Sequence, residues 1–499
     1  MTVHQELLAE LPAGLPDLLA IPGLGPRKVG ALYHELGVTN VDELAAAVEA
    51  GKVEALSGFG KKSAEKILEG IAFLSRSAGR TPLGVGLGIA TALSEQVRTM
   101  PGVKRVELAG STRRGAETVG DLDLLCEADE GAAIVKAFAE LAEAGNVLAA
   151  GKTKGSILVG NPMGGEIQVD LRVVPAESFG AALQYFTGSK AHNVRLREIA
   201  IKKGYKLNEY GLFKDDKQVA GRDEPSIYKK LGLPFIPPEL REDRGEIEAK
   251  SDFADLLTLD DIRGDLHMHT TASDGHDGIK EMAEAARERG YSYIAITEHS
   301  QSSAIANGLS EDRLKRHIEA IRTADDAIKH VKVLAGTECD ILADGRLDYP
   351  DKLLSELDFV IASIHSAQGQ SRERVTQRTV EAMKNPHVHA IGHPSGRLLG
   401  KRDAMDLDWA KVFETSAETH TALEVSASWQ RLDLKDVHVR QAIEAGCMLV
   451  INTDAHATDQ FNQMRWGVTT ARRGWATKTN IVNTKSLTQF KTWLNSKKQ

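Results

Sequence analysis

Alternation of hydrophobic and polar residues, the two-residue period of a strand with one buried face, marks the first half of the chain. It occurs at residues 121–126 and 167–173, and a third strand is expected around 106–109. Apolar positions three and four residues apart predict helices at 89–100 and 132–144. Together these elements predict a small α+β domain whose sheet has one polar face.

A different rhythm, strand then loop then helix, repeats about seven times in the second half of the chain. Helical patterns such as residues 279–289 and 313–328 separate the strands. The predicted strand ends lie at residues 264–269, 294–299, 333–338, 360–365, 389–393, 423–426 and 449–456. Because strands that alternate with helices form parallel sheets, this half is expected to be a distorted (β/α)7 barrel.

Glycine-containing turns join short predicted helices twice near the N-terminus, at residues 21–26 and 56–60. Glycine lets backbone N–H groups approach a phosphate, so a DNA-binding helix-hairpin-helix is one interpretation and an ordinary helical hairpin the other. A Rossmann loop at these glycines or at 84–88 is excluded, because no strand precedes them. The phosphate-binding glycines would be Gly23, Gly25, Gly58 and Gly60, and the expected apolar anchors are Leu18, Leu19, Val29 and Leu32.

Length and composition limit the remaining possibilities. A chain of 499 residues, 42% of them hydrophobic, is long enough for about three domains. The three cysteines, Cys126, Cys339 and Cys447, are too far apart for a Cys-x-x-Cys zinc site, and no apolar run approaches a membrane span. We therefore expect a soluble cytoplasmic protein without membrane contact. The net charge of −8 argues weakly against nucleic-acid binding, but residues 179–213 hold six basic and two acidic residues.

The most specific chemical pattern is GSTRRGAETVGDLDLLC at residues 110–126. In a strand, Asp121 and Asp123 point to one face, and Asp170 in the other alternating stretch supplies a third carboxylate. Such carboxylates, together with substrate phosphates, suit Mg²⁺ or Mn²⁺. The groups that suit phosphate oxygens are Gly110, Ser111, Arg113 and Arg114. The pattern indicates phosphoryl or nucleotidyl transfer, whereas an isolated Asp-x-Asp would more often be a solvated strand face.

This stretch resembles the nucleotidyltransferase palm of family X DNA polymerases, and the resemblance continues through residues 185–189 and 206–213. It implies that Asp121 and Asp123 hold Mg²⁺ or Mn²⁺ and that Asp170, a third metal ligand, helps to activate the primer 3′-hydroxyl. The residues implied to bind the incoming nucleotide are Gly110, Ser111, Arg114, Gly120, Tyr185, Phe186, Gly188 and Asn193. Besides the glycines of the turns, those implied to bind DNA are Arg172 and Arg197.

Nearly every strand of the expected barrel ends in His, Asp or Glu, and the strand ends of a βα barrel converge at one mouth. Mixed imidazole and carboxylate groups suit Zn²⁺, Mn²⁺ or Fe²⁺. The nine candidate ligands are His267, His269, Asp274, His299, Glu338, His365, His393, Asp454 and His456. The set resembles the polymerase and histidinol phosphatase (PHP) domain, which implies up to three metal ions and phosphoester hydrolysis. Glu298 and Ser426 depart from that family's usual Asp and Asn, but neither is a candidate ligand.

Over the whole chain, the resemblance is to bacterial family X DNA polymerases with a C-terminal PHP domain. It implies helix-hairpin-helix fingers at 1–78, a palm at 79–178, a thumb at 179–241, a linker at 242–262 and a PHP barrel at 263–499. The implied activity is gap filling from dNTPs on gapped or primer-template DNA, with 3′–5′ exonuclease or 3′-end processing in the barrel. Base-excision repair is the implied setting, and a monomer is expected.

Two alternatives remain open at this point. The chain could be a PHP phosphoesterase tethered to DNA by a non-catalytic polymerase-like half, or a non-catalytic scaffold for DNA ends. The complete carboxylate and ligand sets argue against both. Family members usually begin with a further helical domain that binds the 5′-phosphate of a gap, whereas this sequence starts at what resembles the second module. Weak lyase activity and a weak preference for 5′-phosphorylated gaps are therefore expected.

Overall fold

Residues 11–497 are described by the structure, a computed structural model, except for 13, 22, 23, 78, 143–145 and 250. The chain divides into two compact units. The first unit contains the residues up to Arg80 together with Arg397–Ala404, and the second contains Thr81–Gly396 and the residues from Met405 onward. Both candidate catalytic groups of residues belong to the second unit.

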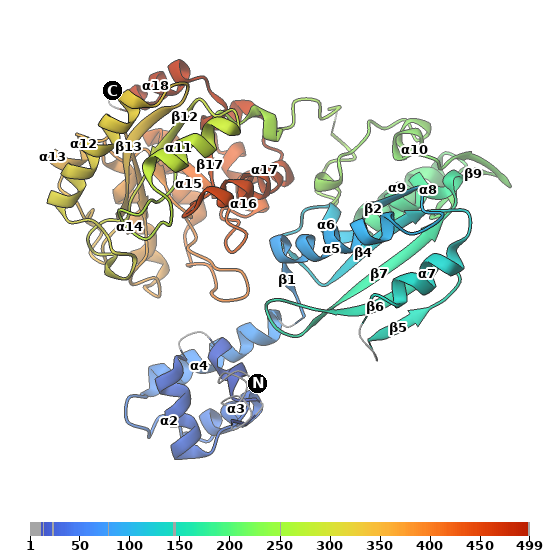
Figure 1. The fold of residues 1–499 in the computed structure, drawn as a ribbon, viewed down its shortest axis with the longest axis horizontal. Coiled ribbons are helices and arrows are strands. Elements are labelled where there is room, and N and C mark those ends of the chain that lie inside the picture. Colours follow the sequence, from blue (N-terminus) through green and yellow to red (C-terminus); the bar gives the residue numbers. More distant parts are fainter. Residues whose placement is uncertain are drawn as a thin grey trace. The chain divides into compact units, whose positions relative to one another are not determined.

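Short helices around one apolar core build the first unit, drawn in blue in Figure 1. They are η1 (Pro16–Ala20), α2 (Pro26–Leu36), α3 (Val41–Glu49) and α4 (Lys61–Ser77). Leu18, Val29 and Leu32 are buried as expected, but the expectation for Leu19 is wrong, since this side chain is 47% exposed. Neighbouring residues of a helical turn point in different directions, so only one of the two leucines faces the core. Gly23 lies outside the described residues.

A five-stranded sheet in the order β2-β4-β7-β6-β5 opens the second unit. Its strands are β2 (Arg105–Leu108), β4 (Asp121–Glu127), β5 (Val147–Ala150), β6 (Lys154–Gly160) and β7 (Glu166–Val174). β4 and β7 are parallel, and the other pairs are antiparallel. The short strands β1 (Thr81–Pro82) and β3 (Thr118–Val119) pair separately. β5 and β6 were not predicted, because β6 contains two glycines and its polar and apolar residues do not alternate cleanly.

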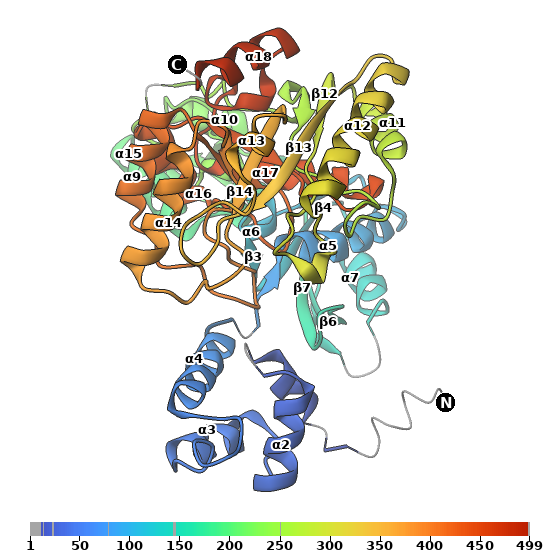
Figure 2. The same ribbon diagram turned by 90° about the vertical axis from the view of Figure 1, so that its left-hand side faces the viewer.

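Two helices, α5 (Leu83–Arg98) and α7 (Gly131–Ala139), cover the apolar face of this sheet (Figures 1 and 2). α5 begins six residues before the predicted start at 89, because its glycines are used for packing rather than for a turn. A Cβ added to Gly86 would lie 2.6 Å from Val119 Cγ2. Helix propensity disfavours glycine by about 1 kcal/mol, which explains why the sequence pattern placed the start too late.

The thumb follows as three helices and a small antiparallel sheet. Its elements are η2 (Ala176–Ser178), α8 (Phe179–Thr187), α9 (Lys190–Lys202), β8 (Lys206–Asn208), β9 (Gly211–Lys214), β10 (Lys217–Ala220), α10 (Glu224–Lys230) and η3 (Pro238–Leu240). α8 packs on the polar face of the large sheet at Leu125, beyond the aspartates of β4. It therefore leaves the carboxylate end of that face open to a ligand.

Residues 242–262, predicted as an unpatterned linker, have one short helical turn, η4 (Leu259–Asp261), within the part that the structure describes. Their first half is nevertheless packed against the thumb. Glu246 is fully buried and lies 2.7 Å from His192 Nδ1, while its carboxylate also accepts from the backbone N–H of Asp243 and Arg244. The buried carboxylate of Glu246 fixes this segment against the thumb. The charged composition of the segment does not show which of its carboxylates is buried.

Seven parallel strands, neighbours in chain order, form the sheet of the C-terminal part, as predicted. They are β11 (Gly264–Asp265), β12 (Tyr293–Ile296), β13 (Lys332–Asp340), β14 (Phe359–Ser363), β15 (Ala390–Ile391), β16 (Ala422–Ser426) and β17 (Leu449–Asn452). Just beyond β11 and β17, Met268 bridges to Ala455, and the His269 N–H donates to the Ala455 carbonyl at 2.8 Å. The first and last strands thus meet, and the barrel is nearly closed.

Helices surround the barrel. They are α11 (Ile279–Glu288), η5 (Ala304–Ala306), α12 (Glu311–Ala327), α13 (Asp351–Leu354), α14 (Arg372–Lys384), α15 (Trp409–Thr419), α16 (Asp436–Glu444), η6 (Thr458–Gln463), α17 (Met464–Arg473), η7 (Lys478–Asn480), η8 (Val482–Thr484) and α18 (Leu487–Ser496). Phe490 of α18 packs in the inner core and stacks on Tyr293 at 4.7 Å between ring centroids. Because apolar rings fill the interior near the strand starts, the polar strand ends gather at the opposite mouth. Among the described helices, none is long and apolar enough to cross a lipid bilayer.

Candidate active sites

The first candidate site is a row of three carboxylates on β4 and β7. Asp123 lies directly opposite Asp170 in the parallel pairing, and Asp121 lies opposite Gln168. Leu122 and Leu124, which alternate with the aspartates of β4, are buried on the face that α5 and α7 cover. The alternation of the sequence thus places the three carboxylates on one open face, as the pattern predicts.

Electrostatics distinguish the members of this row. Burial, together with the negative charges of Asp121 and Asp170, raises the pKa of Asp123 to about 7. For Asp170, burial acts in the same direction, but hydrogen bonds from Ser156 and Gln168 and the charge of Lys154 outweigh it and lower its pKa. The contacts to Asp170 are 2.5 Å from Ser156 Oγ, 2.8 Å from Gln168 Nε2 and 3.1 Å from Lys154 Nζ. A divalent cation between these carboxylates would relieve the repulsion that raises the pKa of Asp123.

The short helix α6 (Gly110–Arg113) begins against this carboxylate row. Gly110 has a φ of +61°, and a Cβ added there would lie 2.1 Å from Asp123 Oδ2, so only glycine allows this approach. Arg114 follows the helix, and its Nη1 lies beside Gly188 and donates to the Thr187 carbonyl at 2.6 Å. Arg113 is turned away from the row, since Glu224 accepts from both of its terminal nitrogens at 2.9 and 2.7 Å. Of the two arginines, Arg114 is therefore the candidate phosphate ligand.

Aromatic and amide groups of α8 and α9 lie next to this helix. The rings of Tyr185 and Phe186 meet edge to face at 5.2 Å, and the Arg172 guanidinium lies 5.0 Å from the Phe186 centroid. Asn193 donates to the Tyr185 carbonyl at 2.7 Å and accepts from Gln184 at 2.7 Å. The exposed Arg197 donates to the Asn193 carbonyl at 3.3 Å. In this conformation Asn193 fixes the end of α8, and it would have to exchange these bonds to contact a base.

The second candidate site lies at the barrel mouth, where Glu338 is the central carboxylate. Its oxygens lie 2.7 Å from His299 Nδ1, 2.9 Å from His393 Nε2 and 3.2 Å from His365 Nε2. His267 Nε2 lies 3.5 Å from both Glu338 and Asp454. One buried carboxylate thus contacts imidazoles that four different strand ends supply.

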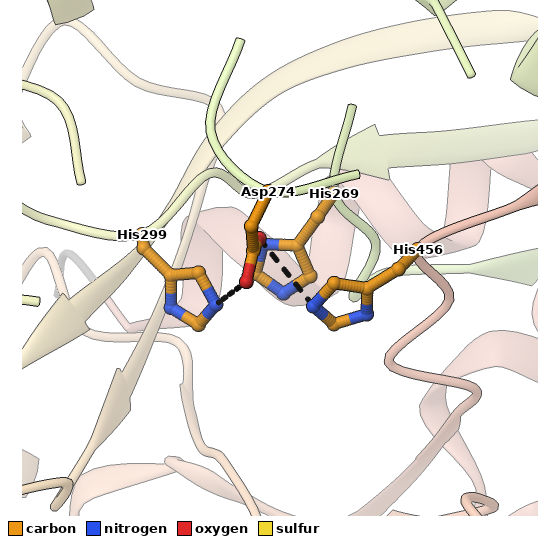
Figure 3. A group of neighbouring side chains, drawn as sticks. All are labelled: His269, Asp274, His299 and His456. Carbon is orange, nitrogen blue, oxygen red and sulfur yellow. Dashed lines mark ion pairs between the residues drawn. The ribbon is translucent and has the colours of Figure 1, made fainter. Parts of the chain in front are cut away.

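Eight of the nine predicted ligands fall into three sets whose ligand atoms lie within 4.8 Å of one another. The sets are His269, Asp274, His299 and His456; His267, His269 and Asp454; and His299, Glu338 and His365. Figure 3 shows the first set, with Asp274 between His299 and His456, 3.5 Å from each. The ninth, His393, is outside the sets but contacts Glu338. Because His269 and His299 each belong to two sets, the three sets form one continuous cluster.

The outer nitrogens of three of these histidines are held by acceptors, two of them carboxylates outside the sets and one the backbone carbonyl of a set member. His267 Nδ1 lies 2.9 Å from Glu424, His365 Nδ1 lies 3.0 Å from Asp340, and His456 Nδ1 lies 2.8 Å from the Asp454 carbonyl. In metal sites such acceptors orient the imidazole so that the other nitrogen faces the ion. His267 Nε2 is buried and has no hydrogen-bond partner among the described residues, although two carboxylates flank it. These residues fit divalent metal ions.

Protonation of the histidines balances the charge of the carboxylates in the metal-free cluster. Although burial opposes it, the charges of Glu338 and Asp274 raise the pKa of His299 to about 10, and those of Glu338 and Asp340 raise that of His365 to about 9. Burial and the neighbouring His299 lower the pKa of His269 to about 4. Metal ions bind neutral imidazole, so they would displace protons from His299 and His365.

Comparison with known proteins follows the same division of the chain. Family models match at residues 15–72 (SAM-like helix-hairpin-helix tandem), 182–242 (DNA polymerase beta thumb) and 265–428 (PHP domain). A Bacillus subtilis (strain 168) protein named DNA polymerase/3′-5′ exonuclease PolX is 42% identical over 98% of this chain and 86% of its own length. The chain belongs to the bacterial family X DNA polymerases with a PHP domain. The expected multidomain fold, with helix-hairpin-helix, polymerase-type palm and thumb, and PHP barrel, is thereby confirmed.

Other relatives of this family X chain match single parts of it. A Syntrophotalea carbinolica protein named probable phosphatase is 32% identical over 33% of this chain and 65% of its own length. The solved ternary gap complex of Leishmania infantum polymerase beta is 26% identical and covers 45% of this chain and 88% of that one, with a TM-score of 0.31.

Several residues of the family X sites were not predicted. Lys154 and Ser156 contact Asp170, and Ser156 is its register partner on the unpredicted strand β6. Asp340 is the last residue of β13, a position that could have signalled a role, whereas Glu424 is the middle residue of β16. Glu298, noted as a departure from the family, is fully buried, contacts His317 at 3.2 Å and holds the loop before Asp274 through Thr270 and Ser273. Ser426, the other departure, donates its N–H to the Asp433 carbonyl at 2.5 Å.

The helix-hairpin-helix glycines belong to the other unit. Gly25 precedes α2, and Gly60 precedes α4. Gly58 has a φ of +84°, which requires glycine in its turn. A Cβ added at Gly25, Gly58 or Gly60 would meet no heavy atom of the described chain within 4 Å. Their surroundings are therefore open, as backbone contact with a phosphate requires.

Metal binding at the carboxylate row of this family X polymerase should depend on pH. Below pH 7 a proton competes with the metal for Asp123, whose pKa is raised to about 7. The half-saturating concentration of Mn²⁺ should therefore rise by about tenfold for each unit that the pH falls below 7, and stay level above it. The measurement is a titration with Mn²⁺ in the absence of nucleotide, on the parent protein and on Asp123→Asn. The binding that the parent shows and the variant lacks is assigned to the carboxylate row. An affinity of this site that is constant from pH 6 to 8 would contradict the assignment.

Proposed function

We propose that this protein is a DNA polymerase that fills gaps and extends primers from dNTPs, and that its PHP barrel removes nucleotides from 3′ ends. The observation that carries the first activity is the row of Asp121, Asp123 and Asp170 on one open sheet face, with the pKa of Asp123 raised by its neighbours. The cluster around Glu338 carries the second. Both agree with the activities named for the B. subtilis relative.

In the polymerase reaction, Asp121 and Asp123 would hold Mg²⁺ or Mn²⁺, which supply charge neutralisation for the phosphates of the dNTP. Asp170, kept ionised by Ser156, Gln168 and Lys154, would accept the proton of the primer 3′-hydroxyl. The residues that would cradle the triphosphate are Gly110, Ser111, Arg114, Gly120 and Gly188. Tyr185, Phe186 and Asn193 would face the sugar and base, and Arg172 and Arg197, with Gly25, Gly58 and Gly60, would contact DNA.

In the barrel, the three sets of ligands would hold Mn²⁺, Zn²⁺ or Fe²⁺, which activate water and bind phosphoryl oxygens. The protein residues orient that chemistry. Glu424 and Asp340 fix the rings of His267 and His365, and Glu338 ties the sets together. We further propose that the protein acts as a monomer in the cytoplasm during base-excision repair.

The test uses one 5′-labelled primer in a gapped duplex, incubated with and without dNTPs in MnCl₂. We expect extension to the end of the gap with dNTPs and stepwise shortening without them, and both should cease when a chelator is added. Shortening should release nucleoside monophosphates. Release of inorganic phosphate alone from a 3′-phosphorylated primer would favour a tethered phosphoesterase, and DNA binding with neither activity would favour a scaffold.

A further inference from the structure

Arg473, at the end of α17 in the PHP part, contacts the palm and the thumb end at once. Its side chain is 7% exposed. Nη1 donates to the Arg114 carbonyl at 2.7 Å, and Nη2 donates to Glu242 Oε1 at 3.0 Å. A charged group that is this buried requires partners for its whole donor set, so Arg473 is fixed by what surrounds it.

Glu242 joins this arginine to the candidate triphosphate ligand. Its Oε1 accepts from Arg473 Nη2 and also from Arg114 Nε, both at 3.0 Å. With Nε held by Glu242 and Nη1 held by the Thr187 carbonyl, the plane of the Arg114 guanidinium is set. Arg114 is also near the carboxylate row, because its backbone N–H donates at 3.3 Å to the carbonyl of Gly110, the glycine that lies against Asp123. Arg473 therefore acts on Arg114 twice, at its backbone and through Glu242.

On its other side Arg473 is anchored within the PHP part. Asp436, the first residue of α16, accepts from Arg473 Nε at 3.1 Å and lies 2.9 Å from Nη2. Arg244 also donates to Asp436, at 2.9 Å. Asp436 and Glu242 thus hold the Arg473 guanidinium between them, and a shift of either part of the chain would move it.

Palm glycines allow the PHP residues to come this close. A Cβ added to Gly115, directly after Arg114, would lie 2.2 Å from Thr469 Cγ2, one turn before Arg473 on α17. A Cβ added to Gly84 of α5 would lie 2.5 Å from the Trp429 Cβ. The glycines at 84 and 115 are explained by this contact, and neither forms a nucleotide loop.

We propose that Arg473 is a positioning residue for nucleotide binding: it holds Glu242, and through it the Arg114 guanidinium, in the orientation that receives the triphosphate. The PHP part would then contribute to dNTP affinity without touching the nucleotide. This inference rests on the proposed role of Arg114 as a triphosphate ligand.

The test is single-turnover incorporation on saturating gapped DNA over a range of dNTP concentrations. In Arg473→Gln, the half-saturating dNTP concentration should rise about tenfold, while the maximal rate changes less than threefold. Arg472→Gln is the matched control. Arg472 precedes Arg473 on α17 and also joins the PHP part to the preceding segments, through Glu239 at 2.8 Å and the Leu257 carbonyl at 2.6 Å. Among the described residues, its hydrogen bonds involve neither Arg114 nor Glu242.

Arg114→Gln should show the same rise, and the double variant Arg114→Gln with Arg473→Gln should be no worse than Arg114→Gln alone, because both act on one contact. Equal behaviour of the Arg473 and Arg472 variants would overturn the inference while leaving the role of Arg114 intact. An unchanged dNTP dependence in Arg114→Gln would refute that role and the inference with it. Unchanged 3′-end resection by the barrel shows that each variant is folded. If Arg473→Gln is unstable, Arg473→Lys gives the same comparison, because it keeps the charge without the planar guanidinium.

Discussion

Asp123→Asn should reduce nucleotide incorporation by at least about a thousandfold and leave 3′-end resection unchanged. The asparagine has the same shape, but its neutral amide removes one of the charges that would hold the metal ions against the triphosphate. A metal contribution of several kcal/mol to the transition state corresponds to a loss of about this size. The measurement is extension of a gapped primer, with resection of the same primer as the internal reference.

The stability of the same variant separates loss of chemistry from loss of folding. In the folded protein the pKa of Asp123 is raised to about 7. In an unfolded chain the pKa of an aspartate is about 3.9. The ionised carboxylate therefore destabilises the metal-free protein at pH values above 7, and asparagine removes this destabilisation. At pH 8 and with a chelator present, the midpoint temperature of unfolding of Asp123→Asn should be equal to or higher than that of the parent protein.

Asp129→Asn is the matched control for this substitution. Asp129 is an exposed aspartate that pairs with Lys104 at 2.8 Å at the surface, and surface pairs of this kind contribute little to stability. It should keep both activities. Incorporation by Asp123→Asn within tenfold of the parent would show that the carboxylate row is not the polymerase site.

The carboxylate row was predictable because its signal is local. A two-residue alternation places Asp121 and Asp123 on one face whatever the rest of the fold does, and the alternating Leu122 and Leu124 select the buried face. Lys154 and Ser156 were not predictable, because β6 contains two glycines and its register against β7 depends on tertiary pairing. Arg113 and Arg114 were indistinguishable in the sequence, since only the position of Glu224, more than a hundred residues later, shows that Arg113 is turned away from the carboxylate row.

The gathering of the candidate ligands at the barrel mouth was predictable for a related reason. All but Asp274, which lies in the loop after His269, are at or just beyond the end of an apolar stretch, and parallel strand ends converge without knowledge of side-chain detail. The partners that orient them were missed because a buried carboxylate such as Glu424 looks the same in sequence whether it binds a metal, a histidine or a backbone amide. The contact of α17 with the palm was beyond sequence reasoning for another reason. It depends on two glycines that read as turn residues, and on a buried arginine whose partners lie in three different parts of the chain.

His299→Ala should reduce 3′-end resection by at least about a thousandfold while primer extension continues. His299 belongs to two of the three candidate ligand sets, so its loss would remove a donor from two proposed metal positions at once. It should also lower the metal content of the purified protein more than His456→Ala, which takes a donor from one set. Both quantities are measured on the same preparation, by resection of a labelled primer and by elemental analysis after dialysis without chelator.

The matched control is His330→Asn. His330 is exposed and has a φ of +76°, in the left-handed region, a conformation that asparagine tolerates. It should change neither resection nor metal content. The two active sites are separate if His299→Ala extends primers at the parental rate and Asp123→Asn resects them at the parental rate. The palm and the PHP part touch through Arg473. A modest rise in the half-saturating dNTP concentration of His299→Ala would therefore indicate that the substitution displaces Arg473. Loss of both activities in both variants would contradict two independent sites and make one metal cluster responsible for the whole chemistry.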